Sequence, residues 1–119
     1  MESSLTTRQI GARAEDIACH YLQQQGLQLL CKNFNCKMGE VDLIMQHGKY
    51  LVFVEVRLRK NPYYGDGLMS ITRTKQRRLA RTALYYLQQQ RKLNSACRFD
   101  VVALAEAQKI DWIQNAFYI

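Results

Sequence analysis

The sequence predicts an α/β fold in which a mixed sheet of about five strands is flanked by helices, in the order α-β-β-β-α-β-β. Two observations lead to this prediction. Apolar residues recur at helical spacing in two segments, whereas five other segments are short runs rich in β-branched and aromatic residues. With 119 residues and 48% hydrophobic side chains, the chain has the size and composition of one globular domain, so residues 1–119 are treated as one domain.

The first helix is expected to begin at Thr6 or Thr7, either of which can cap its N-terminus, and to end near Gln25, directly before Gly26. Its buried stripe consists of Ile10, Ala14, Ile17, Ala18, Tyr21 and Leu22. Glu15 lies at the margin of this stripe. It is either an exposed acid, which the helical spacing alone favours, or a side chain that reaches into a cleft between helix and sheet.

Three strands are predicted next. Residues 27–35 form the first, and residues 40–46 and 50–57 form an antiparallel hairpin closed by a short loop at His47 and Gly48. Because side chains alternate along a strand, one face of this hairpin is apolar throughout and carries Val41, Leu43, Met45, Val52, Val54 and Val56. The opposite face is apolar near the loop and charged at the far end.

The charged end of that face holds the candidate functional residues. The predicted register places Gln46 opposite Lys49, so that Glu40 faces Glu55. Asp42 then lies diagonal to Glu55, with Arg57 beside them. Carboxylates on a covered strand face cost free energy unless a cation binds them, so the predicted metal ligands are Asp42, Glu55 and Glu40, and Mg²⁺ would fit. The alternative is a solvated face with cross-strand ion pairs.

A second helix is predicted from Ser70 or Thr72 to about Gln90, with an inward surface made of Leu79, Ala83, Leu84, Tyr86 and Leu87. Its first half is strongly basic and carries Arg73, Lys75, Arg77, Arg78 and Arg81. Cations at a helix N-terminus oppose the helix dipole, so helix stability does not explain them. An external anion such as a phosphate does, and a solvated basic face is the alternative.

The charge of the whole chain points to the same class of partner. A net charge of +7 favours an anionic partner such as nucleic acid or an acidic surface. The loop at 60–67 contains the one proline of the chain, and its Tyr63 and Tyr64 either stack on bases or pack locally. Nucleic-acid contacts are therefore predicted both from this loop and from the basic helix.

Two further strands are predicted at 98–104 and 109–119, joined by a short polar turn. The continuous apolar run from Val101 to Leu104 indicates that the first of them is covered on both faces. A strand covered on both faces fits a sheet that has helices packed against it on two sides.

Several other classes of protein are not favoured. No segment is long and apolar enough to span a membrane, and the N-terminus lacks the pattern of a signal peptide, so a cytoplasmic protein is expected. The cysteines show no C-x-x-C pair and are expected to be free thiols in or near the core; they are Cys19, Cys31, Cys36 and Cys97. No zinc site is expected, since Cys31, Cys36 and His47 do not have the spacing of the common zinc families.

Five landmarks along the chain resemble the YraN family of uncharacterised bacterial proteins, and this match spans nearly the whole sequence. The landmarks are residues 11–15 (GARAE), 33–36 (NFNC), 39–44 (GEVDLI), 53–57 (FVEVR) and 98–102 (RFDVV). The family is expected to have the restriction-endonuclease-like core of the PD-(D/E)xK superfamily, distantly similar to archaeal Holliday junction resolvases. The resemblance therefore implies an endonuclease that uses Mg²⁺ or Mn²⁺ to hydrolyse DNA rather than RNA, with branched or junction DNA in repair or recombination as a candidate substrate.

Carried over position by position, Asp42 and Glu55 would bind the metal, and Glu15 would be the helix acid beside them. Arg57 departs from the pattern, because the superfamily has a lysine at this position. A lysine with a lowered pKa can help to activate water, whereas arginine stays protonated and can only orient the nucleophile or stabilise charge. The alternative is a non-catalytic nucleic-acid-binding adaptor that retains the fold. Junction resolvases act as dimers, so the resemblance also allows a homodimer.

Overall fold

The computed structural model describes residues 6–59, 71–105 and 109–117. The two helices are α1 (Thr7–Gln24) and α2 (Arg73–Gln89). The strands are β1 (Gln28–Cys36), β2 (Gly39–His47), β3 (Tyr50–Arg59), β4 (Ala96–Ala105) and β5 (Ile110–Ile113). The predicted element order and the mixed five-stranded sheet are both confirmed. Tyr63 and Tyr64 lie outside the described residues, as does the whole loop at 60–67.

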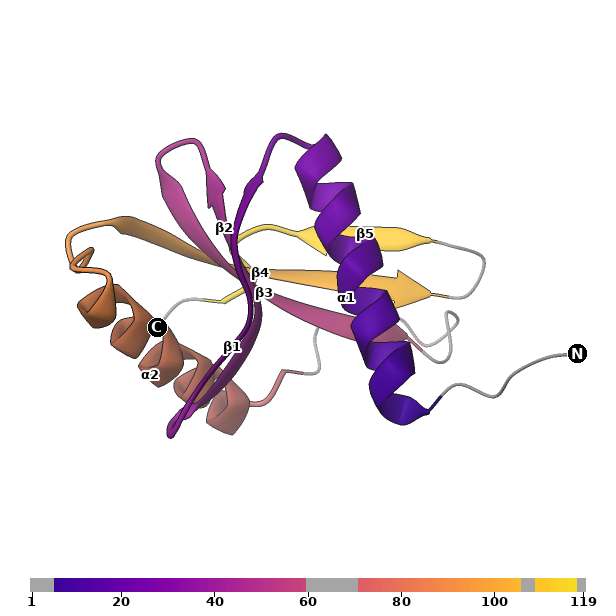
Figure 1. Ribbon diagram of the computed structural model, residues 1–119, viewed down its shortest axis with the longest axis horizontal. Coiled ribbons are helices and arrows are strands. Elements are labelled where there is room, and N and C mark those ends of the chain that lie inside the picture. Colours follow the sequence, from indigo (N-terminus) through magenta and orange to yellow (C-terminus); the bar gives the residue numbers. More distant parts are fainter. Residues whose placement is uncertain (1–5, 60–70, 106–108, 118–119) are drawn as a thin grey trace, which may run out of the picture.

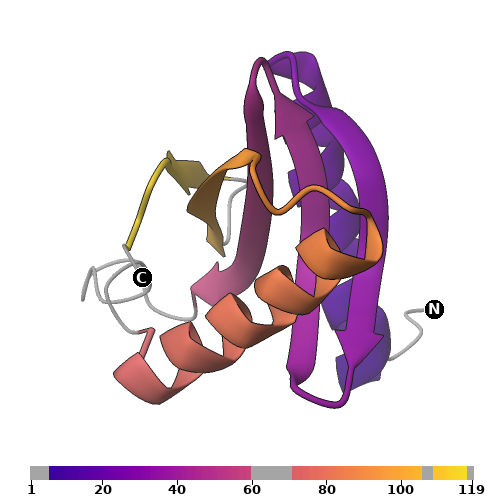
Figure 2. The same ribbon diagram turned by 90° about the vertical axis from the view of Figure 1, so that its left-hand side faces the viewer.

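The sheet has the strand order β1-β2-β3-β4-β5, and β3 and β4 are its parallel pair. The other neighbouring strands are antiparallel. Parallel neighbours need a crossover connection, and α2 lies in the chain segment that makes it. The two helices cover opposite faces of the sheet (Figures 1 and 2).

Each helix packs on its own hydrophobic cluster. The cluster under α1 includes Ala14, Ala18, Leu22, Leu43, Met45, Val52, Val54 and Val102. The cluster under α2 includes Val41, Ile44, Leu51, Phe53, Leu79, Ala83, Tyr86 and Leu87. The residues from Val101 to Leu104 are all buried, as predicted for a strand covered on both faces.

The loop between β2 and β3 differs from the prediction. Gly48 and Lys49 form it, so His47 pairs with Tyr50 and Gln46 with Leu51, two residues away from the predicted register. Gly48 has a φ of +57°, which glycine adopts at low cost, and this fixes the loop one residue later than expected. A shift by two residues leaves the alternation of faces unchanged, so most of the predicted apolar face is correct. Val41 is the exception, because it belongs to the cluster under α2.

The sheet forks between β2 and β3. Their ladder ends at the pair Leu43–Val54, although β2 begins at Gly39 and β3 continues to Arg59. Figure 1 shows the β1–β2 hairpin curving away from β3 at this end. The predicted pairing of Glu40 with Glu55 is therefore wrong: Glu40 pairs with Asn35 of β1, and Glu55 lies beside Val101 of β4.

Three boundaries or faces also differ from the sequence-based expectation. Ile10 and Ile17 are exposed on α1, where Cys19 is buried instead, and Leu84 is exposed on α2, where Thr82 is buried. The last strand ends at Ile113, well before the predicted end at residue 119. The helix starts are as expected: Thr6 caps α1 in a capping box with Gln9.

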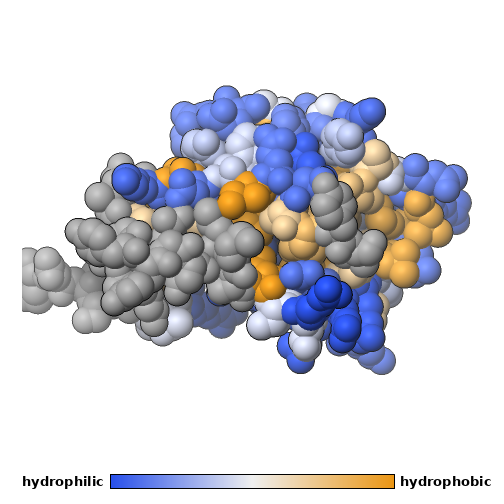
Figure 3. Space-filling model, turned by 180° about the vertical axis from the view of Figure 1, so that it is seen from behind, coloured by the Kyte–Doolittle hydropathy of each residue, from blue (hydrophilic) through white to orange (hydrophobic). Residues whose placement is uncertain are grey.

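The surface of the molecule is mixed. In the view from behind, hydrophobic residues lie in the middle of the face among hydrophilic ones (Figure 3).

All four cysteines are free, with Cys19 buried and the others half-buried, as predicted. Neither of the helices in the described residues is apolar enough over a sufficient length to cross a membrane.

Candidate functional site

Three of the predicted carboxylates meet at the fork in the sheet. Asp42 of β2 lies between Glu15 of α1 and Glu55 of β3, and its carboxyl group is close enough to each of them to share a hydrogen bond. The Oδ2 atom of Asp42 also accepts a hydrogen bond of 2.8 Å from the backbone N–H of Val56. Three segments that are distant in the sequence thus bring their acidic side chains together. Glu15 is one of these acids, so of its two predicted alternatives the side chain that reaches between helix and sheet is the one observed.

The environment of Asp42 opposes its negative charge. Burial is the largest cause that raises the pKa of Asp42. The hydrogen bond and the charge of Glu55 raise this pKa further, to about 8. The N–H of Val56 acts in the opposite direction and lowers this pKa. Asp42 therefore binds its proton more tightly than a free aspartic acid does, and the site favours an added positive charge.

Glu15 experiences the same environment more weakly. Burial raises its pKa, and so does the charge of Glu40, whereas hydrogen bonds with Asn33 and Asp42 lower it. Asn33 has a φ of +53°, a backbone conformation that asparagine tolerates better than most residues. Glu15 therefore lies at the edge of the site, between Asp42 and Asn33 of β1.

The carboxylate of Glu55 is buried and incompletely satisfied. Its side chain is 7% exposed, and its Oε2 atom is 2.5 Å from the ammonium nitrogen of Lys75 in α2, whose side chain is 50% exposed. Within the described residues, Oε2 accepts no hydrogen bond of good geometry. A buried carboxylate oxygen with unused acceptor capacity is suited to a further cation.

Asp42 and Glu55 fit a hard divalent cation, because both offer oxygen ligands and Oε2 of Glu55 already holds a cationic group, the ammonium of the half-exposed Lys75. Within the residues described, no three His, Cys, Asp or Glu side chains are grouped tightly enough to hold a metal ion by themselves. Mg²⁺ does not require such a cage, since it is commonly bound through one or two carboxylates together with waters and substrate phosphates.

The remaining predicted residues of the strand site lie at its margins. Glu40 is exposed at the start of β2. Arg57 is half-buried on β3, two residues beyond Glu55, beside Ala103 of β4. The fork separates Glu40 from β3, which leaves it further from Glu55 than a continuous hairpin would place it.

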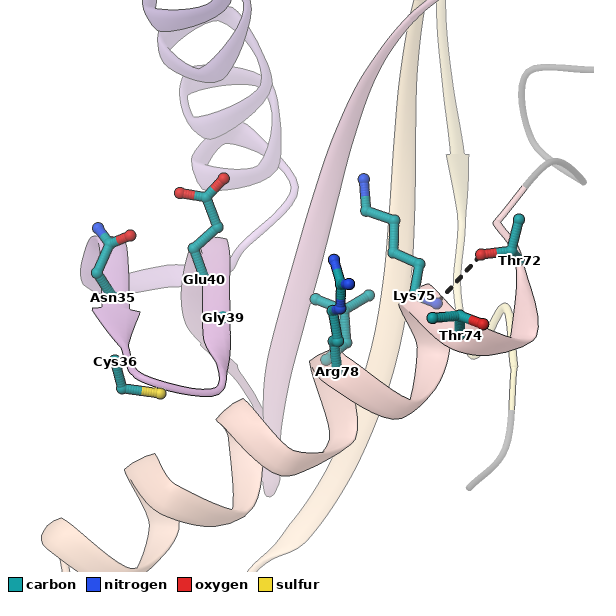
Figure 4. A pocket seen from close by; sticks show the side chains of 9 residues that line it. Asn35, Cys36, Gly39, Glu40, Thr72, Thr74, Lys75 and Arg78 are labelled. Carbon is teal, nitrogen blue, oxygen red and sulfur yellow. Dashed lines mark hydrogen bonds between the residues drawn. The ribbon is translucent and has the colours of Figure 1, made fainter.

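A cleft of about 580 Å³ opens between the β1–β2 turn and the first turns of α2 (Figure 4). Its lining residues are Asn35, Cys36, Gly39, Glu40, Thr72, Thr74, Lys75, Arg78 and Leu79. Thr72 caps the helix by accepting a hydrogen bond from the backbone N–H of Lys75, and the first turn contains no acidic residue. The helix wall of the cleft is therefore basic, and Glu40 lies on the opposite wall.

A glycine allows the two walls to approach each other. Gly39 has a φ of +148°, and a Cβ atom at this position would be 3.1 Å from the Oγ1 atom of Thr82 on α2. That hydroxyl is buried and donates to the carbonyl of Arg78. The Gly39-Glu40 step of the predicted motif thus has a structural role that the sequence did not reveal.

The structure divides the predicted basic residues of α2. All five are exposed, but only Lys75 and Arg78 line the cleft. Arg81 borders a separate apolar groove formed with residues such as Phe53 and Phe99. Arg73 and Arg77 line neither depression.

A buried polar network was not assigned a role from the sequence. Asp100 accepts hydrogen bonds from Nε and a second nitrogen of Arg98, from Nε1 of Trp112 and from the backbone N–H of Asn115, at 2.9 to 3.0 Å. Arg98 also contacts Nδ1 of His47 at 2.9 Å. The signal was available, because two opposite charges at positions i and i+2 of an apolar strand share one face and can pair. The network joins β4, β5 and the end of β2.

The sequence model of the uncharacterised protein family UPF0102 matches residues 14–104, which include the forked strands and the start of α2. The chain belongs to the UPF0102 family. This is the family also called YraN, to which the landmarks pointed.

Other UPF0102 proteins are similar over almost their whole length. A UPF0102 protein of Coxiella burnetii (strain RSA 493 / Nine Mile phase I) is 47% identical over 114 residues, which cover 95% of each chain. One from Nitrosococcus oceani is 46% identical and covers 96% of this chain and 95% of its own. One from Herminiimonas arsenicoxydans is 50% identical over 93% of this chain and 89% of its own. These names state a family and no activity.

Proposed function

We propose that this UPF0102 protein is an endonuclease that uses Mg²⁺ or Mn²⁺ to hydrolyse phosphodiester bonds in DNA. The observation that carries the proposal is the pair of half-buried Asp42 and buried Glu55, in which the pKa of Asp42 is raised to about 8, next to a basic cleft. A site that demands positive charge and adjoins a surface suited to anions matches a phosphodiester with its metal. Branched or junction DNA is the candidate substrate that the YraN resemblance adds.

In this mechanism Asp42 and Glu55 would hold the metal, and the N–H of Val56 fixes the direction of the Asp42 carboxylate. A divalent metal held there would supply a water of lowered pKa and positive charge for the phosphate oxygens. Glu15, beside Asp42, would accept a hydrogen bond from the nucleophilic water. Arg57 contributes a guanidinium group that can stabilise the charge of the pentacovalent transition state but is not suited to act as a base.

The helix side of the cleft binds the phosphate backbone in this proposal. Lys75 and Arg78 contribute positive charge, and Thr74 contributes a hydroxyl group at the start of α2. Free backbone N–H groups of the first helical turn also favour an anion there. Such contacts position the backbone without reading its sequence, which suits an enzyme that recognises the shape of DNA.

The proposal is tested by incubating linear, branched and single-stranded DNA with the purified protein and Mg²⁺ or Mn²⁺. Cleavage by the wild-type protein is expected to fall at least ~100-fold in Asp42→Asn and Glu55→Ala, because metal catalysis supplies several kcal/mol of transition-state stabilisation. Equal cleavage by the wild type and both variants would identify a contaminating nuclease and remove the catalytic claim.

A second candidate function is a nucleic-acid-binding adaptor without turnover, which the arginine at position 57 favours. The adaptor requires DNA binding that persists in EDTA and weakens steeply with salt. Absence of cleavage together with such binding would select the adaptor.

Both functions suit a protein that meets DNA in the cytoplasm, and a homodimer would match the two-fold symmetry of a junction. Sedimentation with and without junction DNA tests the dimer.

A further inference from the structure

We propose that Lys75 is a built-in counter-cation of Glu55, that a divalent metal displaces it, and that the displaced ammonium group then binds phosphate in the adjoining cleft. This inference rests on the proposed metal site and adds a coupling between metal and DNA. Lys75 is the residue that links the two parts of the site. Its ammonium nitrogen is 2.5 Å from Oε2 of Glu55, and its side chain also lines the cleft beside Arg78.

The metal and the ammonium group compete for the same oxygen atom. A Mg²⁺ or Mn²⁺ ion would approach Oε2 of Glu55 to about 2.1 Å, so an ammonium group still in contact with that oxygen would lie within a few ångströms of a divalent charge. Two cations at that distance repel each other strongly in a buried site. Occupation of the site by metal therefore favours a position of Lys75 away from Glu55.

The displaced side chain has a place to go. Lys75 has a flexible four-carbon stem that is half exposed, and its backbone is held by the cap at Thr72. Arg78 lies one helical turn further along the same wall, and Thr74 precedes Lys75, as Figure 4 shows. An ammonium group released from Glu55 adds one positive charge to a wall that already suits phosphate.

Two consequences follow from this exchange. Lys75 lowers the affinity of the empty site for metal, because the metal must first replace it. Metal in turn raises the affinity of the cleft for phosphate, and by linkage phosphate raises the affinity for metal by the same factor. Lys75 thus makes metal and DNA bind together rather than separately.

The first test measures binding of Mn²⁺ alone by isothermal titration at pH 8 to the full-length wild type and to Lys75→Met and Arg78→Met. Both substitutions remove one positive charge from the same helix wall, but only Lys75 contacts Glu55. We expect Lys75→Met to bind Mn²⁺ about 5- to 10-fold more tightly than the wild type, a typical coupling, and Arg78→Met to change the affinity less than twofold. Equal effects of both substitutions would overturn the exchange, as would undetectable Mn²⁺ binding in all three proteins.

The second test measures binding of a fluorescent 20-base-pair duplex in Ca²⁺ or EDTA, with Ca²⁺ chosen to occupy the site without supporting cleavage. The wild type and Arg78→Met are expected to bind the duplex at least about 5-fold more tightly in Ca²⁺, and Lys75→Met is expected to lose this gain. A gain that survives in Lys75→Met, or its absence from the wild type, would overturn the proposal. Neither test requires turnover, so a protein that shows the coupling but cleaves no DNA would refute only the nuclease.

Discussion

Oδ2 of Asp42 accepts a hydrogen bond from the backbone N–H of Val56 at the place where the β2–β3 ladder has already ended. A strand that separates from its neighbour leaves backbone donors without partners, and a buried unpaired donor is costly. The carboxylate of Asp42 takes over this donor. The side chain of Asp42 therefore satisfies a backbone donor of β3 where the ladder has ended, and it also provides an oxygen for the candidate metal site.

Asp42→Asn is expected to alter the pH dependence of stability. The pKa of Asp42 is raised from 3.8 to about 8 in the folded protein, so the native state binds this proton more tightly than the unfolded chain does. The resulting stability is fully present below pH 3.8 and is lost as the pH rises through about 8. Because one pKa unit corresponds to about 1.4 kcal/mol, a shift of roughly four units sets an upper limit of ~6 kcal/mol, and the variant should gain at least ~2 kcal/mol over the wild type between pH 4 and pH 9.

Urea unfolding of both proteins in EDTA at several pH values measures this difference. EDTA is needed because a bound metal would stabilise the ionised form of the wild type alone. Parallel pH profiles for the wild type and Asp42→Asn would show that the raised pKa of Asp42 is not present in solution.

Asp100→Asn is expected to destabilise the fold by ~3–5 kcal/mol, since it leaves the buried guanidinium of Arg98 without its carboxylate. The matched control is Asp16→Asn, which breaks an exposed ion pair between α1 and Lys32 of β1 and should cost less than about 1 kcal/mol. Denaturant midpoints of the two variants provide the comparison. Similar costs would mean that the Asp100 network contributes no more than a surface pair.

Gly39→Ala is expected to cost ~1–3 kcal/mol, because the residue has a φ of +148° and the added Cβ would be 3.1 Å from Oγ1 of Thr82. Gly11→Ala is the control within α1. A Cβ at Gly11 meets nothing within 4 Å, and alanine favours a helix by about 1 kcal/mol, so this change should stabilise the protein. Thermal unfolding distinguishes the two, and a stabilised Gly39→Ala would contradict the close approach of the β1–β2 turn to α2.

Arg78→Gln is expected to weaken DNA binding and to reduce the slope of log affinity against log salt by about one, as for the loss of one phosphate contact. Arg91→Gln removes the same charge beyond the far end of α2, outside the cleft. It should leave the slope nearly unchanged. Fluorescence anisotropy across a range of salt concentrations measures both, and equal slopes would locate the DNA elsewhere on the surface.

The order of the elements could be read from the sequence because it depends on local patterns. Helical spacing, the cap at Thr6 and the apolar run at Val101 each act within a few residues of the chain. The wrong predictions concern strand pairing, where the position of one loop or of one ladder end changes every pair that follows. A loop at Gly48 and Lys49 moved the register by two residues, and the fork removed the predicted contact between Glu40 and Glu55.

The strand pattern predicted the acids at positions 42 and 55, the sequence showed the basic character of α2, and the family resemblance added Glu15. The predicted register placed Asp42 diagonal to Glu55, but the contacts that these two residues make depend on where the β2–β3 ladder stops and on where α2 crosses the sheet. Those positions are set by packing between segments far apart in the chain. Only the tertiary structure therefore separated Lys75 and Arg78 from the other basic residues, buried Glu55, and placed a lysine of α2 on a carboxylate of β3.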